Sequence, residues 1–302
     1  MQQSNKMHYT KMHGAGNSFV ITEDLHGELQ SEDLSVLALR LCDPETGPGA
    51  DGLMVLVPAD KDADFRMLFY NSDGSSGEMC GNGARCAARY GFEHKLAPDP
   101  GRICIQATAG LVTGRRITKE QYEIRLNNPS VIDLHCCARI KTDPFSGIQS
   151  ESGSPSSARG YSRNVLCSYI ELGSPGIPHA VVSARPEMVN NPESIRDLAS
   201  ALRSSPSFPK GANVTFVAPA GKQLVRAVTY ERGVEDFTLA CGTGCCAAAV
   251  SLMLSGTVTG EDLDILMPGG KLHVQVHRDL DAIREILLTG PTAYVAEGDF
   301  LL

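Results

Sequence analysis

The chain has 302 residues, of which 42% are hydrophobic and 21% are charged, and its formal net charge is −8. A chain of this length buries a large core, either as one large domain or as two domains of ordinary size. With 27 basic against 35 acidic residues, a nucleic-acid or anionic-membrane partner is not expected, because phosphate recognition needs a basic face. The sequence has no membrane-spanning apolar run and no apolar stretch typical of a secretory signal near its start. These properties predict a soluble, cytoplasmic protein.

In chain order, β-like runs outnumber helical ones. Residue types and spacing predict strands at 52–57, 65–70, 103–110, 122–126, 131–134, 214–217, 224–230 and 265–270. They predict helices at 32–41, 83–90, 194–203 and 244–254. This ratio, with one alanine-rich helix in each half, predicts an α/β fold of the α+β type, in which each domain is a mainly antiparallel sheet around a central helix.

Two segments of the sequence resemble each other. Cys-Gly-x-Gly begins at Cys80 and again at Cys241, and each copy precedes an alanine-rich run. A glycine turn between two strand-like runs follows 30 residues after the first cysteine, at Gly110, and 29 residues after the second, at Gly270. The same order at the same spacing predicts an internal duplication, with two equivalent domains.

We place the boundary between the domains at residues 128 and 129, so that the first covers 1–128 and the second begins at 129. Residues 141–162 are rich in serine, glycine and proline, a composition typical of a mobile surface loop. The boundary lies earlier because the β-like runs 122–126 and 131–134 precede this segment, which looks like an insertion without an assigned role.

Ten cysteines are too few for a disulfide scaffold in a chain of this length, and no two stand in Cys-x-x-Cys spacing. Zinc-ribbon and thioredoxin-type sites therefore lack their pattern. Most of these cysteines are expected to be reduced and buried as small apolar residues.

Cys80 and Cys241 differ from the other cysteines because each stands on a turn just before a helix. Free amides and the positive end of a helix dipole favour thiolate over thiol, which predicts lowered pKa values for both. Amides of glycines also form a site for a carboxylate or phosphate. Two such sites facing each other would place thiols on opposite faces of one small anionic substrate. One thiolate would remove a proton next to the carboxylate while the opposite thiol returned another, inverting the stereocentre.

Two other interpretations of the glycine turns stay open at this point. The pattern Gly242-x-Gly244-x-x-Ala247 fits a loose dinucleotide-binding fingerprint, but Cys86 occupies the third position in the first copy. Asp264 stands at about the distance expected for the ribose-binding acid, yet it begins its run rather than ending it. The other interpretation is structural: both elements would be helix caps with buried thiols.

Several motifs together resemble those of the diaminopimelate epimerase family. They are Lys-Met-His-Gly-Ala-Gly-Asn at 11–17, Asn-Ser-Asp-Gly at 71–74, Met-Cys-Gly-Asn-Gly-Ala-Arg at 79–85, Pro-His at 178–179, Tyr-Glu-Arg-Gly at 230–233, Ala-Cys-Gly-Thr-Gly at 240–244 and Pro-Gly-Gly at 268–270. The resemblance runs from about Lys11 to the C-terminus. It implies two pseudosymmetric domains with the active site in the cleft between them, and a C-terminal strand at about 290–302 that completes the first domain, leaving 129–289 as the second.

The resemblance also implies an activity: interconversion of LL- and meso-diaminopimelate in lysine and peptidoglycan precursor biosynthesis. It implies no cofactor, neither pyridoxal phosphate nor a metal, and a homodimer that binds a small-molecule substrate. Carried over by position, the catalytic residues are Cys80, Cys241, Glu231 and His179. The substrate-binding residues are Asn17, Asn71, Gly81, Asn82, Asn213, Glu231, Arg232, Gly242 and Thr243.

Within the resemblance, these residues have distinct roles. The reacting carboxylate would be held by the loops that contain Gly81, Asn82, Gly242 and Thr243, and the distal carboxylate by Arg232. Several have simpler alternatives. Asn17 and Asn71 lie in glycine-containing turns, where asparagine is common for backbone reasons. His179 is by default an ordinary core or surface histidine, and Glu231 with Arg232 an ordinary solvated pair.

Three positions depart from the family pattern. Ser18 stands where an aspartate is usual, Ile177 where many members have asparagine, and Gly52 where others have glutamine. These changes affect the distal pocket more than the proton chemistry, so a racemase acting on histidine, proline or hydroxyproline is an alternative function. Arg232 favours diaminopimelate, because a guanidinium binds a second carboxylate through two hydrogen bonds. A third possibility is a non-catalytic carboxylate-binding protein. Nothing in the sequence assigns each thiol to one direction of the reaction.

Two reactive thiols a substrate's width apart are expected to oxidise to a Cys80–Cys241 disulfide when the site is empty. Activity lost in air should return after addition of a thiol. Peptide mass spectrometry of the oxidised protein should identify the Cys80–Cys241 pair, and pairing among the other cysteines would contradict this prediction.

Overall fold

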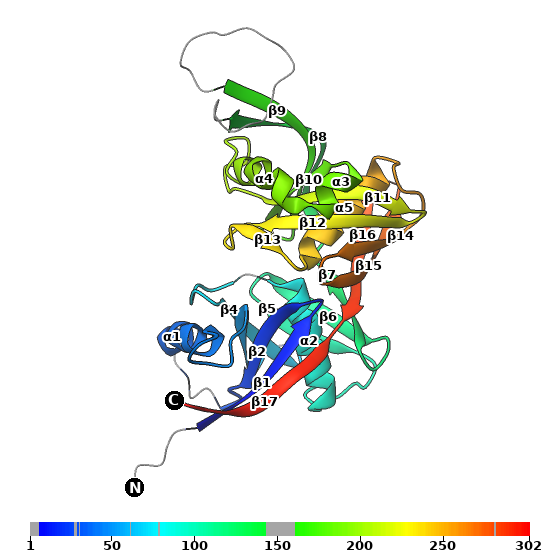
Figure 1. Ribbon diagram of the computed structural model, residues 1–302. Coiled ribbons are helices and arrows are strands. Elements are labelled where there is room, and N and C mark those ends of the chain that lie inside the picture. The colour runs from blue at the N-terminus through cyan, green and yellow to red at the C-terminus, as the bar shows by residue number, and fades with distance from the viewer. Residues whose placement is uncertain are drawn as a thin grey trace.

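The computed structural model describes residues 6–26, 29, 31–60, 62–77, 79–142, 161–280 and 282–302. Its elements form two lobes, one above the other in Figure 1, and strands dominate both. The predicted fold class, a mixed α+β architecture with few helices, is confirmed.

The lower lobe contains the first part of the chain and its last strand. Its strands are β1 (Lys6–Gly14), β2 (Asn17–Glu23), β3 (Gly52–Val57), β4 (Phe65–Asn71), β5 (Ile103–Ala107), β6 (Gly110–Arg116), β7 (Gln121–Leu126) and β17 (Ala293–Leu301). Its helices are α1 (Ser31–Cys42) and α2 (Gly81–Glu93). β17 runs antiparallel to β1, with Leu301 opposite Lys6, so the end of the chain completes the sheet where the chain began.

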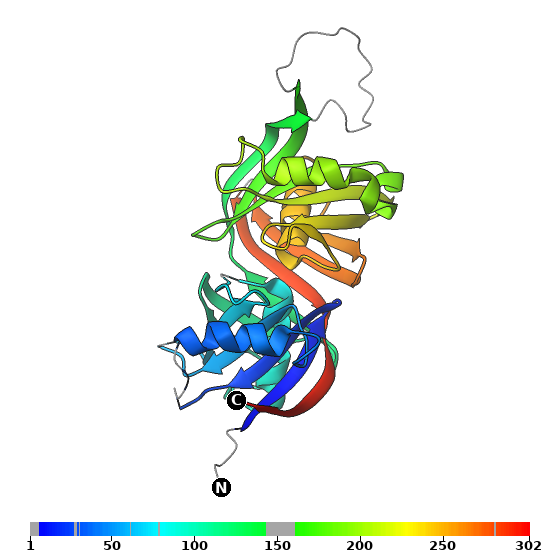
Figure 2. The ribbon, with the colours of Figure 1, turned by 60° about the vertical axis from the view of Figure 1, so that its left-hand side comes forward.

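The upper lobe contains the remaining elements. Its strands are β8 (Pro129–Thr142), β9 (Tyr161–Leu172), β10 (Ile177–Ser183), β11 (Asn213–Gly221), β12 (Leu224–Glu231), β13 (Asp236–Thr238), β14 (Asp262–Met267), β15 (Gly270–Asp279) and β16 (Ala282–Pro291). Its helices are α3 (Pro186–Asn190), the 3₁₀ turn η1 (Pro192–Ile195), α4 (Arg196–Arg203) and α5 (Gly242–Leu254). Figure 2 shows β16 passing from this lobe towards the lower one, where the chain continues as β17.

The two lobes repeat one order of strand pairing. In the lower lobe β2 is parallel to β3, β3 antiparallel to β4, β4 parallel to β5, and β5, β6 and β7 follow antiparallel. In the upper lobe β10, β11, β12, β14, β15 and β16 repeat the same sequence of parallel and antiparallel pairs. The last strands of the two series, β7 and β16, pair with each other. This repetition is the structural counterpart of the duplicated sequence motif.

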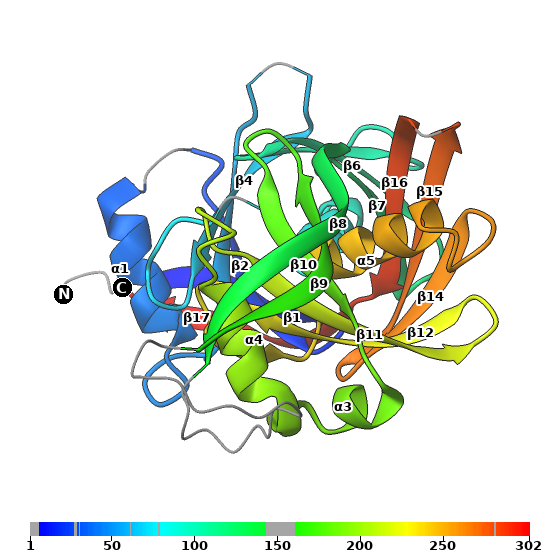
Figure 3. The ribbon, with the colours of Figure 1, turned by 90° about the horizontal axis from the view of Figure 1, so that it is seen from above.

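One helix lies at the centre of each lobe. α2 packs against β1, β2, β5, β6 and β7, and α5 packs against β9, β10, β11 and β15. In the view from above, α5 lies between the β9–β10 strands and β14–β16 (Figure 3). Both helices are buried over most of their length, and their alanines and glycines let the surrounding strands approach closely. Such all-round burial is typical of a helix wrapped by a sheet.

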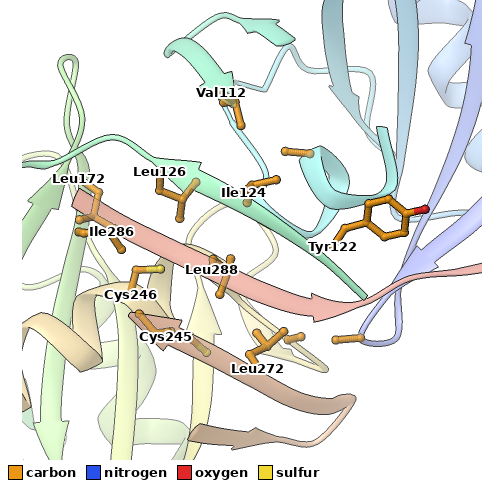
Figure 4. Close-up of a cluster of buried hydrophobic side chains, with 14 of the residues drawn as sticks. Val112, Tyr122, Ile124, Leu126, Leu172, Cys245, Cys246, Leu272, Ile286 and Leu288 are labelled. Atoms are coloured by element: carbon orange, nitrogen blue, oxygen red, sulfur yellow. The ribbon is translucent and has the colours of Figure 1, made fainter. Parts of the chain in front are cut away.

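The apolar core is continuous between the lobes. Figure 4 shows side chains of β7 and β16, among them Ile124 and Leu288, in one cluster with Cys245 and Cys246 of α5. The pairing of β7 with β16 lies within this cluster, so it joins the two lobes at a buried seam. Burial of apolar side chains stabilises such a seam by roughly 25 cal/mol per Å² of apolar area.

Several element boundaries differ from the prediction. α2 and α5 each begin two residues earlier than expected, at Gly81 and Gly242, because their glycines start the helix rather than precede it. β8 and β9 form a long hairpin, so the loop predicted at 141–162 is wrong at 141–142 and 161–162, which are strand. The rest of that segment, 143–160, lies outside the described residues. The domain boundary at 128 and 129 falls between β7 and β8 and stays a prediction.

Gly91 of α2 tests how closely the helix packs in the lower lobe. A Cβ atom there would lie 2.4 Å from Cδ1 of Ile103 and 2.7 Å from Cε1 of Phe65. We expect Gly91→Val to lower the free energy of unfolding by about 1–3 kcal/mol through overpacking, measured by urea denaturation. Gly101→Ala is the control, because its Cβ would meet only Asp99, at 3.4 Å. Equal stability of the two variants would contradict this account of the packing.

Candidate active site

The N-termini of the two central helices meet at a pair of glycines. A Cβ on Gly242 would lie 3.4 Å from the Cα of Gly81 and 2.8 Å from Cδ2 of Leu288, which belongs to β16. Only residues without a side chain allow this approach unless the neighbouring chain shifts. The positive ends of two helix dipoles therefore point to the same region between the lobes.

A cavity of about 610 Å³ opens at this meeting point, within the size range of small-molecule sites. Eleven of the twelve predicted site residues line it: Asn17, Asn71, Cys80, Gly81 and Asn82 from the lower lobe, and Asn213, Glu231, Arg232, Cys241, Gly242 and Thr243 from the upper lobe. Residues more than 200 positions apart are thus brought together. The exception is His179.

Each cysteine is the residue that caps its helix, and each has extended backbone geometry. The Cys80 sulfur donates to Oδ1 of Asn17 at 3.6 Å. The Cys241 sulfur instead accepts from the amide of Gly244 at 3.4 Å and lies 3.6 Å from the hydroxyl of Thr243. The two thiols are equivalent in position but differ in their hydrogen-bond partners.

The predicted lowering of the thiol pKa values is wrong for this structure. Desolvation raises the pKa of Cys80 to about 11 and raises the pKa of Cys241 well above its ordinary value, and the charge of Glu231 adds to both shifts. Amides at the helix starts, from Gly83 to Cys80 and from Gly244 to Cys241, act in the predicted direction. Removal from water outweighs them, because burial disfavours the charged form.

Glu231 stands at the end of β12, beside both cysteines in the cavity wall. Burial raises the pKa of its carboxyl group, and the charge of Asp51 adds to the rise. The hydroxyl of Thr238 partly offsets this rise. Glu231 is therefore easier to protonate than an ordinary surface glutamate, which suits a group beside a reacting centre.

Arg232 and Asn213 also line the cavity and are joined by a hydrogen bond. The backbone N–H of Arg232 donates to Oδ1 of Asn213 at 2.9 Å, and Nδ2 of Asn213 donates to the Pro178 carbonyl at 3.2 Å. The guanidinium of Arg232 donates to the Lys210 carbonyl at 3.1 Å and forms no ion pair with a carboxylate in the described ranges. Glu171, its acidic neighbour, pairs with Lys210 instead. The Arg232 charge is thus available to an anionic ligand.

Asp51 and Ser18 are site residues that sequence reasoning did not assign. Oδ2 of Asp51 accepts from Nδ2 of Asn17 at 2.9 Å and from the backbone N–H of Ser18 at 2.6 Å. The serine hydroxyl donates to the same oxygen at 3.1 Å. Although the usual aspartate is missing at position 18, Asp51 supplies a carboxylate beside Asn17. The sequence feature that could have indicated this role is the acidic residue Asp51 directly before Gly52, the position at which the chain departs from the family pattern.

His179 lies on β10, opposite Asn213 in the strand register, and is fully buried. It is not among the residues that line the cavity. Neither ring nitrogen has a hydrogen-bond partner in the part of the chain that the structure describes. Desolvation, with a smaller effect from the charge of Arg232, lowers its pKa to about 3, so the ring is neutral at pH 7. Its predicted place beside the reacting centre stays a prediction.

Among the described residues, no three or more His, Cys, Asp or Glu side chains are grouped as a metal site. Nor does that part of the chain contain a helix long and apolar enough to cross a membrane.

Comparison with known proteins matches this chain to the family model described as diaminopimelate epimerase, over residues 9–125 and 173–295. Diaminopimelate epimerase of Bacillus licheniformis is 32% identical over 302 residues, which cover 99% of each chain. The Bacillus subtilis enzyme of the same name is 31% identical over 99% of this chain and all of its own. Residues 126–172 of this chain, which lie between the two matched segments, contain the strands β8 and β9.

Solved structures share the fold at low sequence identity. A Bacillus anthracis phenazine biosynthesis protein of the PhzF family aligns with a TM-score of 0.71 at 14% identity, covering 99% of this chain and all of the other. A hydroxyproline epimerase from Agrobacterium vitis aligns with a TM-score of 0.68 at 17% identity, covering 100% of this chain and 94% of the other. At these identities the likeness concerns the fold alone.

The buried, neutral His179 predicts a specific pH dependence of stability. Its pKa is about 3 in the folded chain and 6.5 in the unfolded chain. As the pH falls, the unfolded chain therefore binds a proton on this ring before the folded chain does. Its contribution to the free energy of unfolding is therefore complete above pH 6.5 and is lost as the pH falls towards 3, by about 1.4 kcal/mol per pH unit.

Urea unfolding between pH 4.5 and 7.5 measures this effect. His179→Leu should reduce the slope of stability against pH, whereas His135→Leu, at an exposed histidine, should keep the wild-type slope. An unchanged slope in His179→Leu would show that the ring is not held neutral.

Proposed function

Because the chain belongs to the diaminopimelate epimerase family, we propose that it interconverts LL- and meso-diaminopimelate by proton transfer between two thiols at the α-carbon. The observation that carries this proposal is the placement of Cys80 and Cys241. Each caps one of two helices whose N-termini meet at one cavity, and the two cysteines come from different lobes.

The carboxylate next to the reacting carbon would bind where the helix starts converge. Gly81 and Gly242 start the two helices, carry no side chain and line the cavity, and Thr243 lines it at the same end of α5. Negative charge grows on this carboxylate as the α-proton leaves. Amides held in place before the reaction stabilise such charge without having to reorganise.

Proton transfer then needs one thiolate and one thiol on opposite sides of the α-carbon. The thiolate takes the α-proton, and the opposite thiol gives its proton to the other face, which inverts the configuration. Since burial raises both thiol pKa values, ionisation has to be favoured by the substrate. Its α-ammonium group supplies the opposite charge, because a nearby cation favours an ionised thiol. Each cysteine ends the reaction in the protonation state in which the other began.

The distal end of the substrate would lie against Arg232. Its guanidinium has no carboxylate partner in the described ranges and suits the second carboxylate of diaminopimelate. Asn17, Asn71 and Asn213 line the cavity and offer amide groups to the remaining polar atoms. His179 enters this proposal only as a neutral, buried residue that does not line the cavity.

Ile177 supports a second candidate, a racemase of another amino acid. It lines the cavity with an apolar side chain where many family members have asparagine. A substrate without a polar distal group would lose less binding free energy against this apolar side chain than one with a polar distal group. Arg232 favours the first candidate, because its partly buried guanidinium has no carboxylate ion-pair partner in the described ranges and suits a second carboxylate.

We further propose that the protein works in the cytoplasm as a homodimer, without a nucleic-acid or membrane partner. The net charge of −8 supports the absence of a polyanionic partner. Sedimentation equilibrium at micromolar concentration would test the oligomeric state.

Exchange of the α-hydrogen in heavy water tests the reaction. We expect the wild-type protein to incorporate deuterium at the α-carbon of LL- and meso-diaminopimelate, detected by mass spectrometry. Cys80→Ala and Cys241→Ala should each lower the rate of interconversion by at least about 10²–10⁴-fold, the usual contribution of a positioned acid or base. Cys137→Ala, at an exposed cysteine outside the cavity, should keep full activity.

The same assay over a panel of histidine, proline and hydroxyproline separates the two candidate functions. Exchange only with one of these amino acids would replace diaminopimelate as the substrate. Tight binding of diaminopimelate without any exchange would indicate a non-catalytic protein. If either cavity cysteine could be replaced by alanine without loss, the two-thiol mechanism would be wrong.

A further inference from the structure

Arg85, one turn into α2, is the largest fully buried side chain among the residues that the structure describes. Its guanidinium forms no ion pair with any carboxylate in the described ranges. The ionisable groups that face it are thiols, those of Cys80 and Cys86 on its own side and of Cys245 and Cys246 from α5. A buried charge without a counter-ion costs several kcal/mol, so the position requires an explanation.

The contacts of Arg85 lead towards the active site. Nη2 donates to Oδ1 of Asn82 at 2.8 Å, and Nη1 donates to the Gly81 carbonyl at 3.4 Å. Nε has no hydrogen-bond partner within the described part of the protein. The guanidinium is thus directed at the two residues that start α2, although Arg85 itself does not line the cavity.

Two glycines leave room for the guanidinium. A Cβ on Gly290 of β16 would lie 2.9 Å from Nε and 3.0 Å from Cζ of Arg85. A Cβ on Gly14 of β1 would lie 3.4 Å from Nη2 and 2.9 Å from the Asn82 carbonyl oxygen. Side chains at either position would press on the arginine or its partner, so both strands are shaped to hold it.

Asn82 connects Arg85 to the upper lobe and, through Asn17, to the Cys80 thiol. Its Nδ2 donates to the Ala240 carbonyl at 2.9 Å and to Oδ1 of Asn17 at 3.2 Å. Ala240 precedes Cys241, and Oδ1 of Asn17 is also the acceptor for the Cys80 sulfur. One amide group therefore lies between the two catalytic cysteines.

We propose that Arg85 is a positioning residue of the proposed two-thiol reaction, fixing the side-chain amide of Asn82 and through it the amide of Asn17 beside Cys80. This inference rests on the proposed function.

The orientation of both amides follows from the groups at the two ends of the hydrogen-bonded series, which are Arg85 at one end and Asp51 at the other. A guanidinium only donates, so the Asn82 atom that faces Arg85 must be the oxygen and the atom that faces Asn17 must be the nitrogen. At the other end Oδ2 of Asp51 accepts from Nδ2 of Asn17, so Asn17 turns its nitrogen to Asp51 and its oxygen to Asn82 and Cys80. An asparagine amide by itself has no such preference between its two orientations. A neutral glutamine in place of Arg85 could itself flip, whereas a cation cannot.

A double-mutant cycle tests this inference. Arg85→Met should lower kcat/KM for diaminopimelate about 10–100-fold, because small misplacements at an active site have effects of this size. In an Asn82→Ala background the same substitution should change kcat/KM by no more than about twofold, since its target is already gone. If the two losses multiply, Arg85 does not act through Asn82 and the proposal is overturned.

Two further variants separate positioning from general stability. Arg85→Lys keeps a donor-only cation and should retain more kcat/KM than Arg85→Met, and it replaces Arg85→Met in the cycle if that variant does not fold. Arg89→Met removes a second buried arginine from the same helix, one that binds Glu93 and the Thr292 carbonyl instead. It should lower the melting temperature and leave kcat/KM per folded molecule unchanged. A loss of kcat/KM in Arg89→Met equal to that in Arg85→Met would contradict a specific role.

A measurement without turnover keeps this inference separate from the proposed function. In protein labelled with ¹⁵N-asparagine, the side-chain amide signal of Asn82 is identified by its absence in Asn82→Ala. Its hydrogen exchange should be at least about tenfold faster in Arg85→Met than in wild type or Arg89→Met, because Oδ1 has lost its partner and the amide is held through Nδ2 alone. If wild type shows no exchange of substrate hydrogen but this difference appears, the proposed function fails and the positioning by Arg85 stands. An unchanged amide signal in Arg85→Met would overturn the inference.

Discussion

The close approach of Gly81 and Gly242, with Leu288 against both, determines most of what surrounds it. It brings two helix N-termini to one point, and every other feature of the site is arranged around these ends. The pairing of β7 with β16 supplies the rigid frame, since it joins the last strands of the two repeated series within one apolar core. The cavity is thus a product of the seam between duplicated halves.

Two opposing electrostatic effects meet at the cysteines. Helix dipoles and free amides favour anions there, while the loss of water and the carboxylate of Glu231 disfavour them. At both thiols the second effect is larger. A site with this balance is suited to bind a zwitterion, whose carboxylate uses the amides and whose ammonium group offsets the cost of a thiolate. The charge of the ligand thereby completes the acid–base machinery.

Much of this could be predicted from the sequence, for reasons that differ between features. The repeated Cys-Gly-x-Gly motif predicted both the duplication and the thiol chemistry, because a turn of this kind is encoded within a few consecutive residues. Asp51 and Arg85 were not predicted as parts of the network, since their roles depend on neighbours from other strands. The thiol pKa values were mispredicted because the local helix start is visible in the sequence, whereas depth of burial is not. The second half of β8 was missed because a register shift between Asp133 and Cys136 breaks the alternation of apolar and polar residues that marks a strand.

The return of β17 to β1 has a consequence for how the protein is made. Lys6 pairs with Leu301, so this edge of the lower sheet has no partner until β17, residues 293–301, has been synthesised. An unpaired edge strand exposes backbone donors and acceptors that other chains can pair with. While the upper lobe is still being translated, the lower lobe is a sheet with an open side. The nascent chain is therefore exposed to misassembly at this edge between the synthesis of β1 and the synthesis of β17.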